Sequence, residues 1–488
     1  MSDNQNGQSN NMKNKAISGF LWRFFERCGA QGVTLIVSVI LARLLDPSVY
    51  GTIALVTVFT IILEVFVNSG FANALIQKKD ADDLDYSSVF YFNVVMCIVL
   101  YTLLYFCAPL IARFYELPEL TPLVRVLGLT LLISGVRNVQ QAYVSKNLLF
   151  KRFFFSTIGG TVAAAIIGIW MAFAGYGVWA LVIQQLTNGI VGTAILWATV
   201  KWRPKKMFSF ERLKSLFSYG WKLLVSSLLD TGYNQLRQLI IGKIYTTTDL
   251  AFYNKGSEYT HPIITNINSS IDSVLFPVMS EVQDDKAAIK NMTRRSITVS
   301  SYIMWPMMMG IAACSEPLVR ILLTEKWMPC VPFMRIFCIV YAFYPIHTAN
   351  LNAIKALGRS DLFLKLEIIK KAFGLTIILA TMRYSVMAMA YGAIIASVFS
   401  QIANAWPNRK LLGYSYGQQI KDILPSILLS LVMFGAVYCV QLIGLGDWLT
   451  LLIQIPLGVL VYAGGSKLFE FESFDYVIAT AKGFLKRG

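Results

Sequence analysis

The sequence predicts an all-α integral membrane protein with about fourteen transmembrane helices, organised as two six-helix lobes followed by two C-terminal helices. Three observations lead to this prediction: an apolar composition, long apolar runs along the whole chain, and an internal repeat. Of the 488 residues, 56% are hydrophobic and only 14% are charged, and the mean hydropathy is +0.57. A soluble chain of this length carries more charge and divides into several domains.

The apolar runs have the length of transmembrane helices. About 20 helical residues cross a hydrocarbon core ~30 Å thick, and fourteen such runs occur, of which the seventh, eighth and tenth are unusually polar. In chain order they lie near 16–42, 49–73, 87–112, 122–144, 154–174, 177–199, 216–243, 251–277, 296–315, 330–354, 366–383, 387–407, 424–443 and 448–466. Because fourteen is even, both termini are expected on the same side of the membrane.

The distribution of lysine and arginine predicts which side that is. If the N-terminus is cytoplasmic, the cytoplasmic segments hold 29 of the 43 Lys and Arg residues, the outer loops hold 6, and 8 lie within spans. Cytoplasmic loops of membrane proteins carry this excess of positive charge. Both termini are therefore predicted to be cytoplasmic, and the scattered positive charge gives no indication of nucleic-acid binding.

An internal repeat predicts the two lobes. Similar short sequences recur about 200 residues apart and in the same order: GFLWR at 19–23 with YGWKL at 219–223, ILAR at 40–43 with IIGK at 240–243, and GYGVWALV at 175–182 with RYSVMAMA at 383–390. Units of six spans enter the membrane from the same side, as in transporters with parallel repeats. Chance similarity between apolar helices is the alternative explanation.

The predicted organisation has five parts. The last part is too short and polar to span, and either an amphipathic helix on the membrane surface or a frayed end suits its sequence. The parts are a disordered cytoplasmic N-terminus (1–15), an N-lobe (16–208), a C-lobe (209–408), a final pair of spans (409–466) and a cytoplasmic amphipathic tail (467–488).

Charged residues within the spans are the candidate functional residues. Eight cations and five acids lie at this depth, mostly in spans 1, 2, 4, 7 and 8. Charge inside a bilayer is costly and usually faces a protein interior or a water-filled cavity. Arg125 and Arg335 lie near span ends, where they could reach the interface. The remaining cations are Arg23, Arg27, Arg137, Lys222, Arg237 and Lys255, and Glu64 and Asp230 are candidates for ion coupling.

Two interpretations of these charges remain open. In one, they pair as buried salt bridges between helices, as we expect for Glu26 and Glu258. In the other, the surplus of cations lines a cavity that receives an anionic substrate. Arginine suits phosphate, because its planar fork donates two parallel hydrogen bonds.

Motifs of enzymes, metal sites and cofactor sites are not evident in the sequence. His261 and His347 are the only histidines, the seven cysteines form no C-x-x-C pair, and no Gly-rich phosphate loop occurs. The longest outer loop, at 316–329, is too short for the catalytic loop of a glycan polymerase or ligase. We therefore expect a protein that is not an enzyme and has no cofactor or metal.

Four stretches resemble the polysaccharide-transporter branch of the MATE-like flippase superfamily, in particular Wzx-type flippases such as the colanic acid and teichuronic acid exporters. They are VSVILARLLDPSVYGTIALV at 37–56, NSGFANALIQKKD at 68–80, KNLLFKRF at 146–153 and ALGRSD at 356–361. The resemblance covers nearly all of 15–465, and the ILARxLxPxxYG segment is its most specific part.

This resemblance implies two six-helix lobes around a central cavity and two extra helices. It also implies alternating-access transport of oligosaccharide on undecaprenyl pyrophosphate, from the inner to the outer leaflet of the bacterial cytoplasmic membrane, for lipopolysaccharide or exopolysaccharide synthesis. Membrane lipids and polymerase machinery are the other expected partners. A lipid II-type flippase and a cation-coupled MATE-like drug antiporter are the alternatives. The site residues rest on depth and pairing, not on the resemblance.

Overall fold

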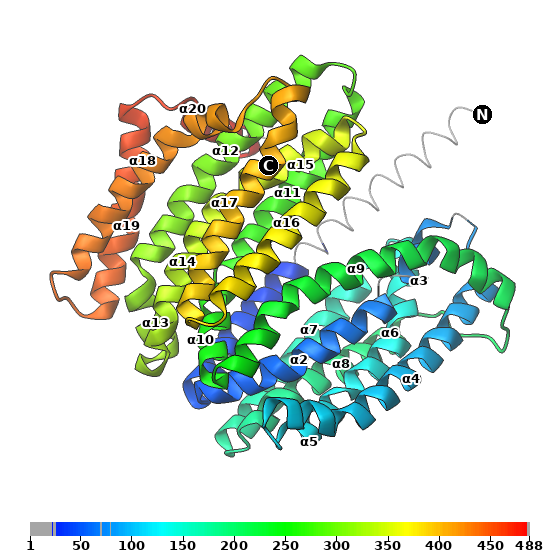
Figure 1. The fold of residues 1–488 in the computed structure, drawn as a ribbon. Coiled ribbons are helices and arrows are strands. Elements are labelled where there is room, and N and C mark those ends of the chain that lie inside the picture. The colour runs from blue at the N-terminus through cyan, green and yellow to red at the C-terminus, as the bar shows by residue number, and fades with distance from the viewer. Residues whose placement is uncertain (1–21, 23–25, 69–70, 79, 486–488) are drawn as a thin grey trace. The chain divides into compact units, whose positions relative to one another are not determined.

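The computed structural model describes residues 22, 26–68, 71–78 and 80–485, and these residues form helices with no strand among them (Figure 1). The predicted all-α membrane fold class is confirmed. The expected disorder of 1–15 lies outside the described residues.

The chain folds as two compact units, Met1–Ala251 and Phe252–Gly488. The first holds the helix Glu26–Leu44, α2 (Pro47–Asn68), α3 (Phe71–Gln77), α4 (Asp83–Tyr115), α5 (Leu120–Leu127), α6 (Leu129–Lys146), α7 (Phe150–Phe173), α8 (Val178–Thr199) and α9 (Phe210–Ile244). Helix α10 (Thr247–Glu258) runs from the first unit into the second. The second continues with α11 (His261–Glu281), α12 (Lys286–Ala313), α13 (Ser315–Leu323), η1 (Glu325–Cys330), α14 (Val331–Ala342), α15 (Tyr344–Ala356), α16 (Ser360–Thr381), α17 (Val386–Leu411), α18 (Tyr416–Gln441), α19 (Asp447–Leu468) and α20 (Glu472–Leu485).

The boundary between the units lies later than the repeat predicts. The repeat starts its second copy near residue 209, whereas α9 packs against α2, α3 and α4 within the N-terminal unit. Packing therefore assigns α9 to the unit that precedes it in the chain.

Eleven helices in the described part of the chain are long and apolar enough to cross a membrane. Three further predicted spans fall on helices that are more polar: 216–243 lies in α9, 366–383 falls mostly on α16, and 251–277 is broken near residue 260 into α10 and α11. The count of fourteen therefore stays a prediction.

Polar caps fix where several helices begin. The Asp82 side chain accepts from the backbone N–H of Asp85 at 2.9 Å, and the Asp85 side chain accepts from the backbone N–H of Asp82 at 3.2 Å. The two residues therefore form a capping box at the start of α4. The hydrogen bond from the Asp85 backbone lowers the pKa of Asp82. At the ALGRSD motif, Gly358 has a φ of 70° and ends α15, a conformation that glycine adopts without strain.

Helix α2 begins at the most specific motif of the sequence. Pro47 occupies its first turn, where a missing N–H costs nothing. Gly51 follows on the face toward the start of α10, and a Cβ there would lie 1.7 Å from the carbonyl oxygen of Thr247. The glycine in this motif is thus explained by a close approach of two backbones within the N-terminal unit.

Small residues bring α7 and α8 together in the N-terminal unit. The Ser156 hydroxyl donates to the Gly192 carbonyl at 2.6 Å, and a Cβ at Gly160 would lie 2.8 Å from the Asn188 carbonyl oxygen. Close packing of this kind is typical of helices in membranes, where small side chains let backbones approach.

A buried amide network joins three helices of the C-terminal unit. Asn350 on α15 donates to Gln419 on α18 at 2.7 Å, Gln419 donates back at 3.0 Å, and Asn408 on α17 donates to the same Asn350 oxygen at 2.7 Å. All three residues are fully buried. Each helix thereby satisfies polar groups that would otherwise stand unpaired in the core.

Replacing Asn350 with leucine is expected to lower the free energy of unfolding by about 2–4 kcal/mol, because the amides of Gln419 and Asn408 lose a buried partner. Thermal unfolding of the purified protein in detergent, followed by size-exclusion chromatography, measures the effect. The matched control is Asn147→Leu, since Asn147 is exposed and its side chain bonds only the Tyr143 carbonyl among the described residues. An equal loss of stability in both variants would contradict the prediction.

Candidate functional site

A polar cluster lies within the spans of the N-terminal unit, between α2 and α6. Glu64 on α2 accepts from the Ser134 hydroxyl on α6 at 3.2 Å. One turn further along, the Asn138 amide donates to Asn68 Oδ1 at 3.0 Å and to the Val67 carbonyl at 2.5 Å. The two helices therefore face each other through polar side chains where lipid-facing helices carry apolar ones.

Arg137 belongs to this cluster. Its guanidinium is half-buried on α6 and attracts the Glu64 carboxylate electrostatically. Within the described part of the chain, Arg137 has neither a hydrogen bond nor an ion pair within 4 Å. The cluster thus holds a cation whose hydrogen-bonding fork remains available to an incoming anion.

Polar residues at helical spacing lie on α9, the unusually polar seventh span. Asn234 donates to Asp230 at 3.2 Å, the contact expected for residues four apart on one helix face. Asp230 is exposed and Arg237 is half-buried on the same helix. The use of Asp230 and Arg237 in coupling and binding stays a prediction.

Lys255 takes part in a structural ion pair. Its side chain is 2% exposed, its ammonium lies 2.8 Å from the Glu258 carboxylate, and it sits over the Tyr259 and Trp327 rings. Glu258 does form an ion pair, but within α10 and not between helices as expected, because its partner lies three residues before it on the same helix. Because Lys255 is enclosed in this way, we leave it out of the proposed substrate contacts.

The first predicted span is only partly described. Arg23 lies outside the described residues, as does the side chain of Lys222. Arg27 is exposed on the helix Glu26–Leu44, and Glu26 is buried and accepts from the Thr157 hydroxyl at 2.9 Å.

The two arginines near span ends are held locally. Arg125 stacks on the Tyr105 ring at 4.1 Å, and Arg335 lies 2.7 Å from the Glu316 carboxylate. These contacts give both arginines a structural role, so neither needs a substrate to explain its presence.

The C-terminal unit contains a polar cavity of about 440 Å³ between α11 and α15. Hydrogen bonds between the two helices hold its walls: Asn352 donates to Asp272 at 2.6 Å, and Thr348 donates to Asn268 at 3.2 Å. The lining residues are His261, Ile264, Thr265, Asn268, Ser269, Asp272, Tyr341, Tyr344, His347, Thr348, Leu351, Asn352 and Lys355.

Aromatic rings and one cation complete this cavity. The His347 ring lies 5.3 Å from the Tyr344 ring and shares a 2.6 Å hydrogen bond with Asn404. Lys355 is exposed, with its ammonium 4.8 Å from the Phe363 ring, and it forms no ion pair with any described residue. Amides, hydroxyls, flat rings and an open cation are a suitable lining for a sugar that carries an anion.

The sequence predicts the polar α11 side of this cavity but not its α15 side. The span at 251–277 is too polar to face lipid, and His261, Asn268 and Asp272 do line the cavity from α11. The α15 side is not predicted by the sequence, because the predicted span at 330–354 ends one residue before Lys355. Its signal is a stripe at helical spacing, namely Tyr344, Thr348, Asn352 and Lys355.

No group of three or more His, Cys, Asp or Glu side chains within the described ranges could hold a metal ion.

Comparisons with known proteins give the family. The family model described as "Polysaccharide biosynthesis protein" matches residues 40–332, more than half of the chain. The teichuronic acid biosynthesis protein TuaB of Bacillus subtilis (strain 168) is 26% identical over 423 residues, covering 83% of this chain and 85% of that protein. The lipopolysaccharide biosynthesis protein WzxC of Escherichia coli (strain K12) is 22% identical, covering 88% of this chain and 89% of that protein.

Solved structures give the fold. The lipid II flippase MurJ, in an inward closed conformation, has a TM-score of 0.74 at 16% identity and covers 93% of this chain and 98% of its own. A MATE family multidrug resistance transporter of the MOP superfamily, facing inward, has a TM-score of 0.58 at 15% identity. The match covers 78% of this chain and 94% of that transporter. The chain, with eleven membrane-spanning candidates among its described residues, therefore has the fold of these solved membrane transporters and belongs to the polysaccharide biosynthesis protein family.

Proposed function

We propose that this protein is a flippase that moves oligosaccharide repeat units linked to undecaprenyl pyrophosphate from the cytoplasmic to the outer leaflet of a bacterial cytoplasmic membrane, by alternating access. Both termini would lie in the cytoplasm, and a polysaccharide polymerase would use the product. The observation that carries the proposal is the polar cavity of about 440 Å³ in the C-terminal unit. A cavity with this lining suits sugar hydroxyls, which need hydrogen-bond partners once they leave water.

The sugar would be held from both walls of this cavity. Asn268 and Asp272 on α11 and Asn352 on α15 offer acceptors and donors, and the exposed Tyr344 offers a flat ring. Small-molecule sites combine apolar or aromatic surface with a few fixed polar groups in this way. The polyprenyl chain would stay in lipid, where its burial costs nothing.

The pyrophosphate would be held by cations. Arg137 is the best supported, since its fork has no hydrogen-bond or ion-pair partner within the described part of the chain and lies beside Ser134 and Asn138. We assign supporting roles to Arg27 and Arg237, and to Arg23 and Lys222, whose side chains are not described. A hydrogen bond between arginine and phosphate is charge-assisted and about twice as strong as a neutral one.

Glu64 is our candidate for ion coupling, with Asp230 second. We expect Glu64→Gln to leave slow downhill transport in place and to abolish its acceleration by a proton gradient, because glutamine cannot take up a proton. The measurement is the transbilayer movement of a fluorescent lipid-linked sugar in proteoliposomes, with and without the gradient. Glu119→Gln, at the connection between α4 and α5, is the matched control. Gradient dependence that survives Glu64→Gln would contradict the assignment.

The proposed substrate is tested by deleting the gene and analysing polyprenyl-pyrophosphate lipids by mass spectrometry. A complete repeat unit should accumulate and should disappear when wild-type protein is restored. Accumulation of lipid II in its place would identify a lipid II flippase. Unchanged lipids together with raised sensitivity to cationic drugs would point to the antiporter.

A further inference from the structure

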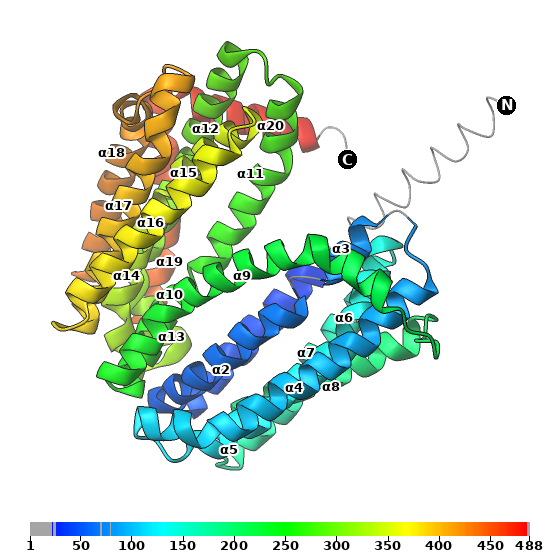
Figure 2. The ribbon, with the colours of Figure 1, turned by 45° about the vertical axis from the view of Figure 1, so that its right-hand side comes forward.

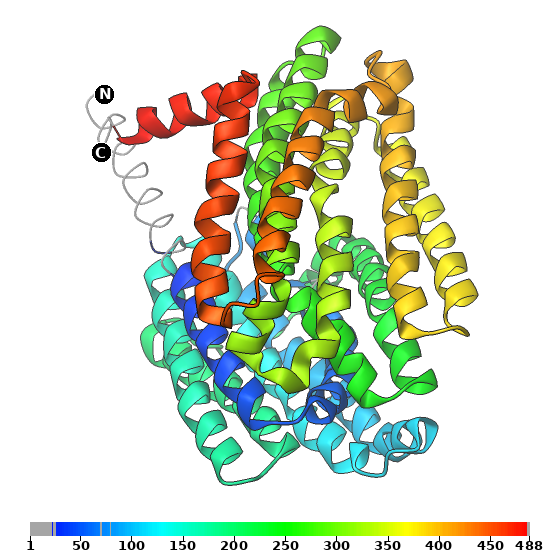
Figure 3. The same ribbon diagram turned by 90° about the vertical axis from the view of Figure 1, so that its left-hand side faces the viewer.

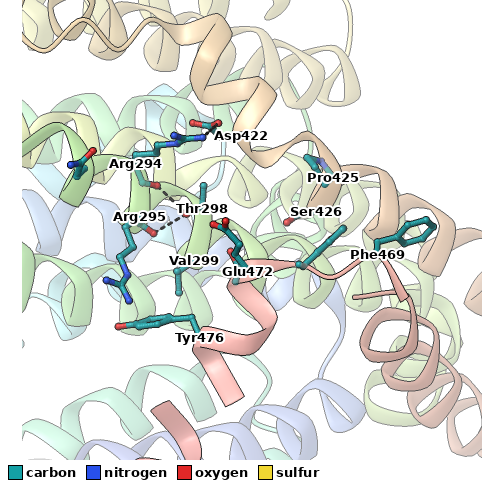
Figure 4. Close-up of a pocket in the computed structure, with 13 residues that line it drawn as sticks. Arg294, Arg295, Thr298, Val299, Asp422, Pro425, Ser426, Phe469, Glu472 and Tyr476 are labelled. Carbon is teal, nitrogen blue, oxygen red and sulfur yellow. Dashed lines mark hydrogen bonds and ion pairs between the residues drawn. The ribbon is translucent and has the colours of Figure 1, made fainter. Parts of the chain in front are cut away.

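A second polar cavity, of about 670 Å³, lies at one end of the C-terminal unit, away from the α11–α15 cavity. Its walls are residues 291–299 in the first half of α12, residues 422–426 in the first half of α18, and the junction from α19 to α20 (Figure 4). The charge distribution predicts this end to be cytoplasmic. Helix α20 runs crosswise to α19 here (Figures 2 and 3), as an amphipathic helix at a membrane surface does.

The cavity is built by specific contacts. The Tyr302 hydroxyl on α12 donates to Ser466 at 2.8 Å, and the Tyr462 hydroxyl on α19 donates to the Tyr302 carbonyl at 2.9 Å. The chain then turns through Glu470, whose φ is 51°, and Phe471 N–H donates back to the Ser466 carbonyl at 3.0 Å. These bonds fix the start of α20 against α12.

Two opposite charges inside this cavity, Arg295 and Glu472, have no ion-pair partner within 4 Å in the described part of the chain. Arg294 is already committed, since it pairs with Asp422 at 2.8 Å, and Asp422 also accepts from Tyr414 at 2.7 Å. Arg295 lies over the Tyr476 ring, with its Cζ 4.1 Å from the ring centre. Among the described residues, neither Arg295 nor Glu472 has an ion-pair partner within 4 Å. Figure 4 shows both in one pocket, with Arg295 above Tyr476 and Glu472 reaching toward α12.

We propose that this cavity binds the zwitterionic phosphate–ammonium headgroup of a membrane phospholipid of the phosphoethanolamine class. The phosphate would meet Arg295, and the primary ammonium would meet Glu472. A headgroup that carries only negative charge would leave Glu472 facing an anion. A quaternary ammonium has no N–H to donate to the carboxylate.

The surroundings favour a lipid over a soluble phosphate. Val299, Pro425 and Phe471 add apolar surface beside the charged groups. Phe469, which lines the cavity, is 65% exposed, and Leu468, which precedes it in the chain, is 77% exposed. Because the membrane-spanning α19 ends at Leu468, the cavity lies where a headgroup lies and its acyl chains could continue along the apolar rim. A volume of about 670 Å³ is within the range of small-molecule sites.

The test uses the full-length protein, delipidated in detergent and offered equal amounts of phosphatidylethanolamine, phosphatidylglycerol and phosphatidylcholine, with native mass spectrometry as the readout. Wild type should retain phosphatidylethanolamine several-fold more than either other lipid. Arg295→Gln and Glu472→Gln should each lower this retention about tenfold, the effect of losing one charge-assisted contact. Lys286→Gln, an exposed change at the start of α12 outside the cavity, should leave retention unchanged.

Hydrogen exchange of α20 supplies a second readout, in which phosphatidylethanolamine should slow exchange in wild type and not in Glu472→Gln. Equal retention by wild type and both variants would overturn the site. A preference for phosphatidylglycerol that persists in Glu472→Gln would overturn the zwitterionic ligand. Equal protection by free phosphoethanolamine would overturn the lipid as its source.

Discussion

Arg137→Ala is expected to reduce transport by about 100-fold while the protein stays folded and in the membrane. The half-buried guanidinium makes no hydrogen bond or ion pair within 4 Å in the described part of the chain, so its loss breaks no direct contact. Glu64 loses only a longer-range electrostatic attraction and keeps its hydrogen bond from Ser134. Two charge-assisted hydrogen bonds to a phosphate contribute about 3–5 kcal/mol together, which is more than a 100-fold effect requires. In a deletion strain carrying this variant, the lipid-linked repeat unit should accumulate.

The comparison variants separate charge from geometry. Arg137→Lys should retain partial activity, because lysine keeps the charge and loses the fork. Arg125→Gln, which removes another arginine of α5–α6 that stacks on Tyr105, should transport normally. Normal transport by Arg137→Ala, with the protein present at the wild-type level, would remove Arg137 from the binding site.

Gly51→Ala is expected to destabilise the N-terminal unit by about 3 kcal/mol or more. The added Cβ would lie 1.7 Å from the Thr247 carbonyl oxygen, 2.4 Å from its carbonyl carbon and 2.8 Å from its Cα. All three are backbone atoms, so no side chain can rotate away, and α2 or the start of α10 must move. Overpacking of a tight contact commonly costs about 1–3 kcal/mol, and a backbone clash of this size exceeds the usual case.

The matched control is the same substitution at Gly435 on α18, where a Cβ meets nothing within 4 Å. There alanine should be neutral or stabilising by up to about 1 kcal/mol, because it favours the helix. The midpoint of thermal unfolding in detergent should therefore fall for Gly51→Ala and hold or rise for Gly435→Ala. Equal midpoints would show that the contact with Thr247 does not constrain α2.

Much of the fold could be predicted because apolar runs and helix caps are local signals. The predicted spans coincide with observed helices nearly throughout, and the motif at Pro47 does open a helix. The tail, for which a frayed end was the alternative, contains α20. The packing of α9 could not be predicted, since which unit a helix joins depends on contacts far apart in sequence.

The candidate site was less accessible to sequence reasoning. Depth within a span selected Arg137 and Glu64 as candidates, but it did not predict that they lie close together. Nor could it distinguish the accessible Arg137 from Lys255, which is enclosed by Glu258 and two aromatic rings. Pairing of this kind depends on rotamers and on the partner helix. Lys355 was missed because span boundaries alone do not show that a helix carries its polar stripe to its end.

The polarity of α9, α11 and α16 also bears on how the protein is made. Each carries too much polar or charged character to count among the apolar spans, and α16 alone has Lys365, Glu367, Lys370 and Lys371 within two turns. Such segments do not partition into lipid by their own hydropathy. The insertion of these helices into the membrane during synthesis must therefore depend on neighbouring helices. A chain truncated after α16 lacks α17, α18 and α19, so we expect it to be incompletely inserted and degraded.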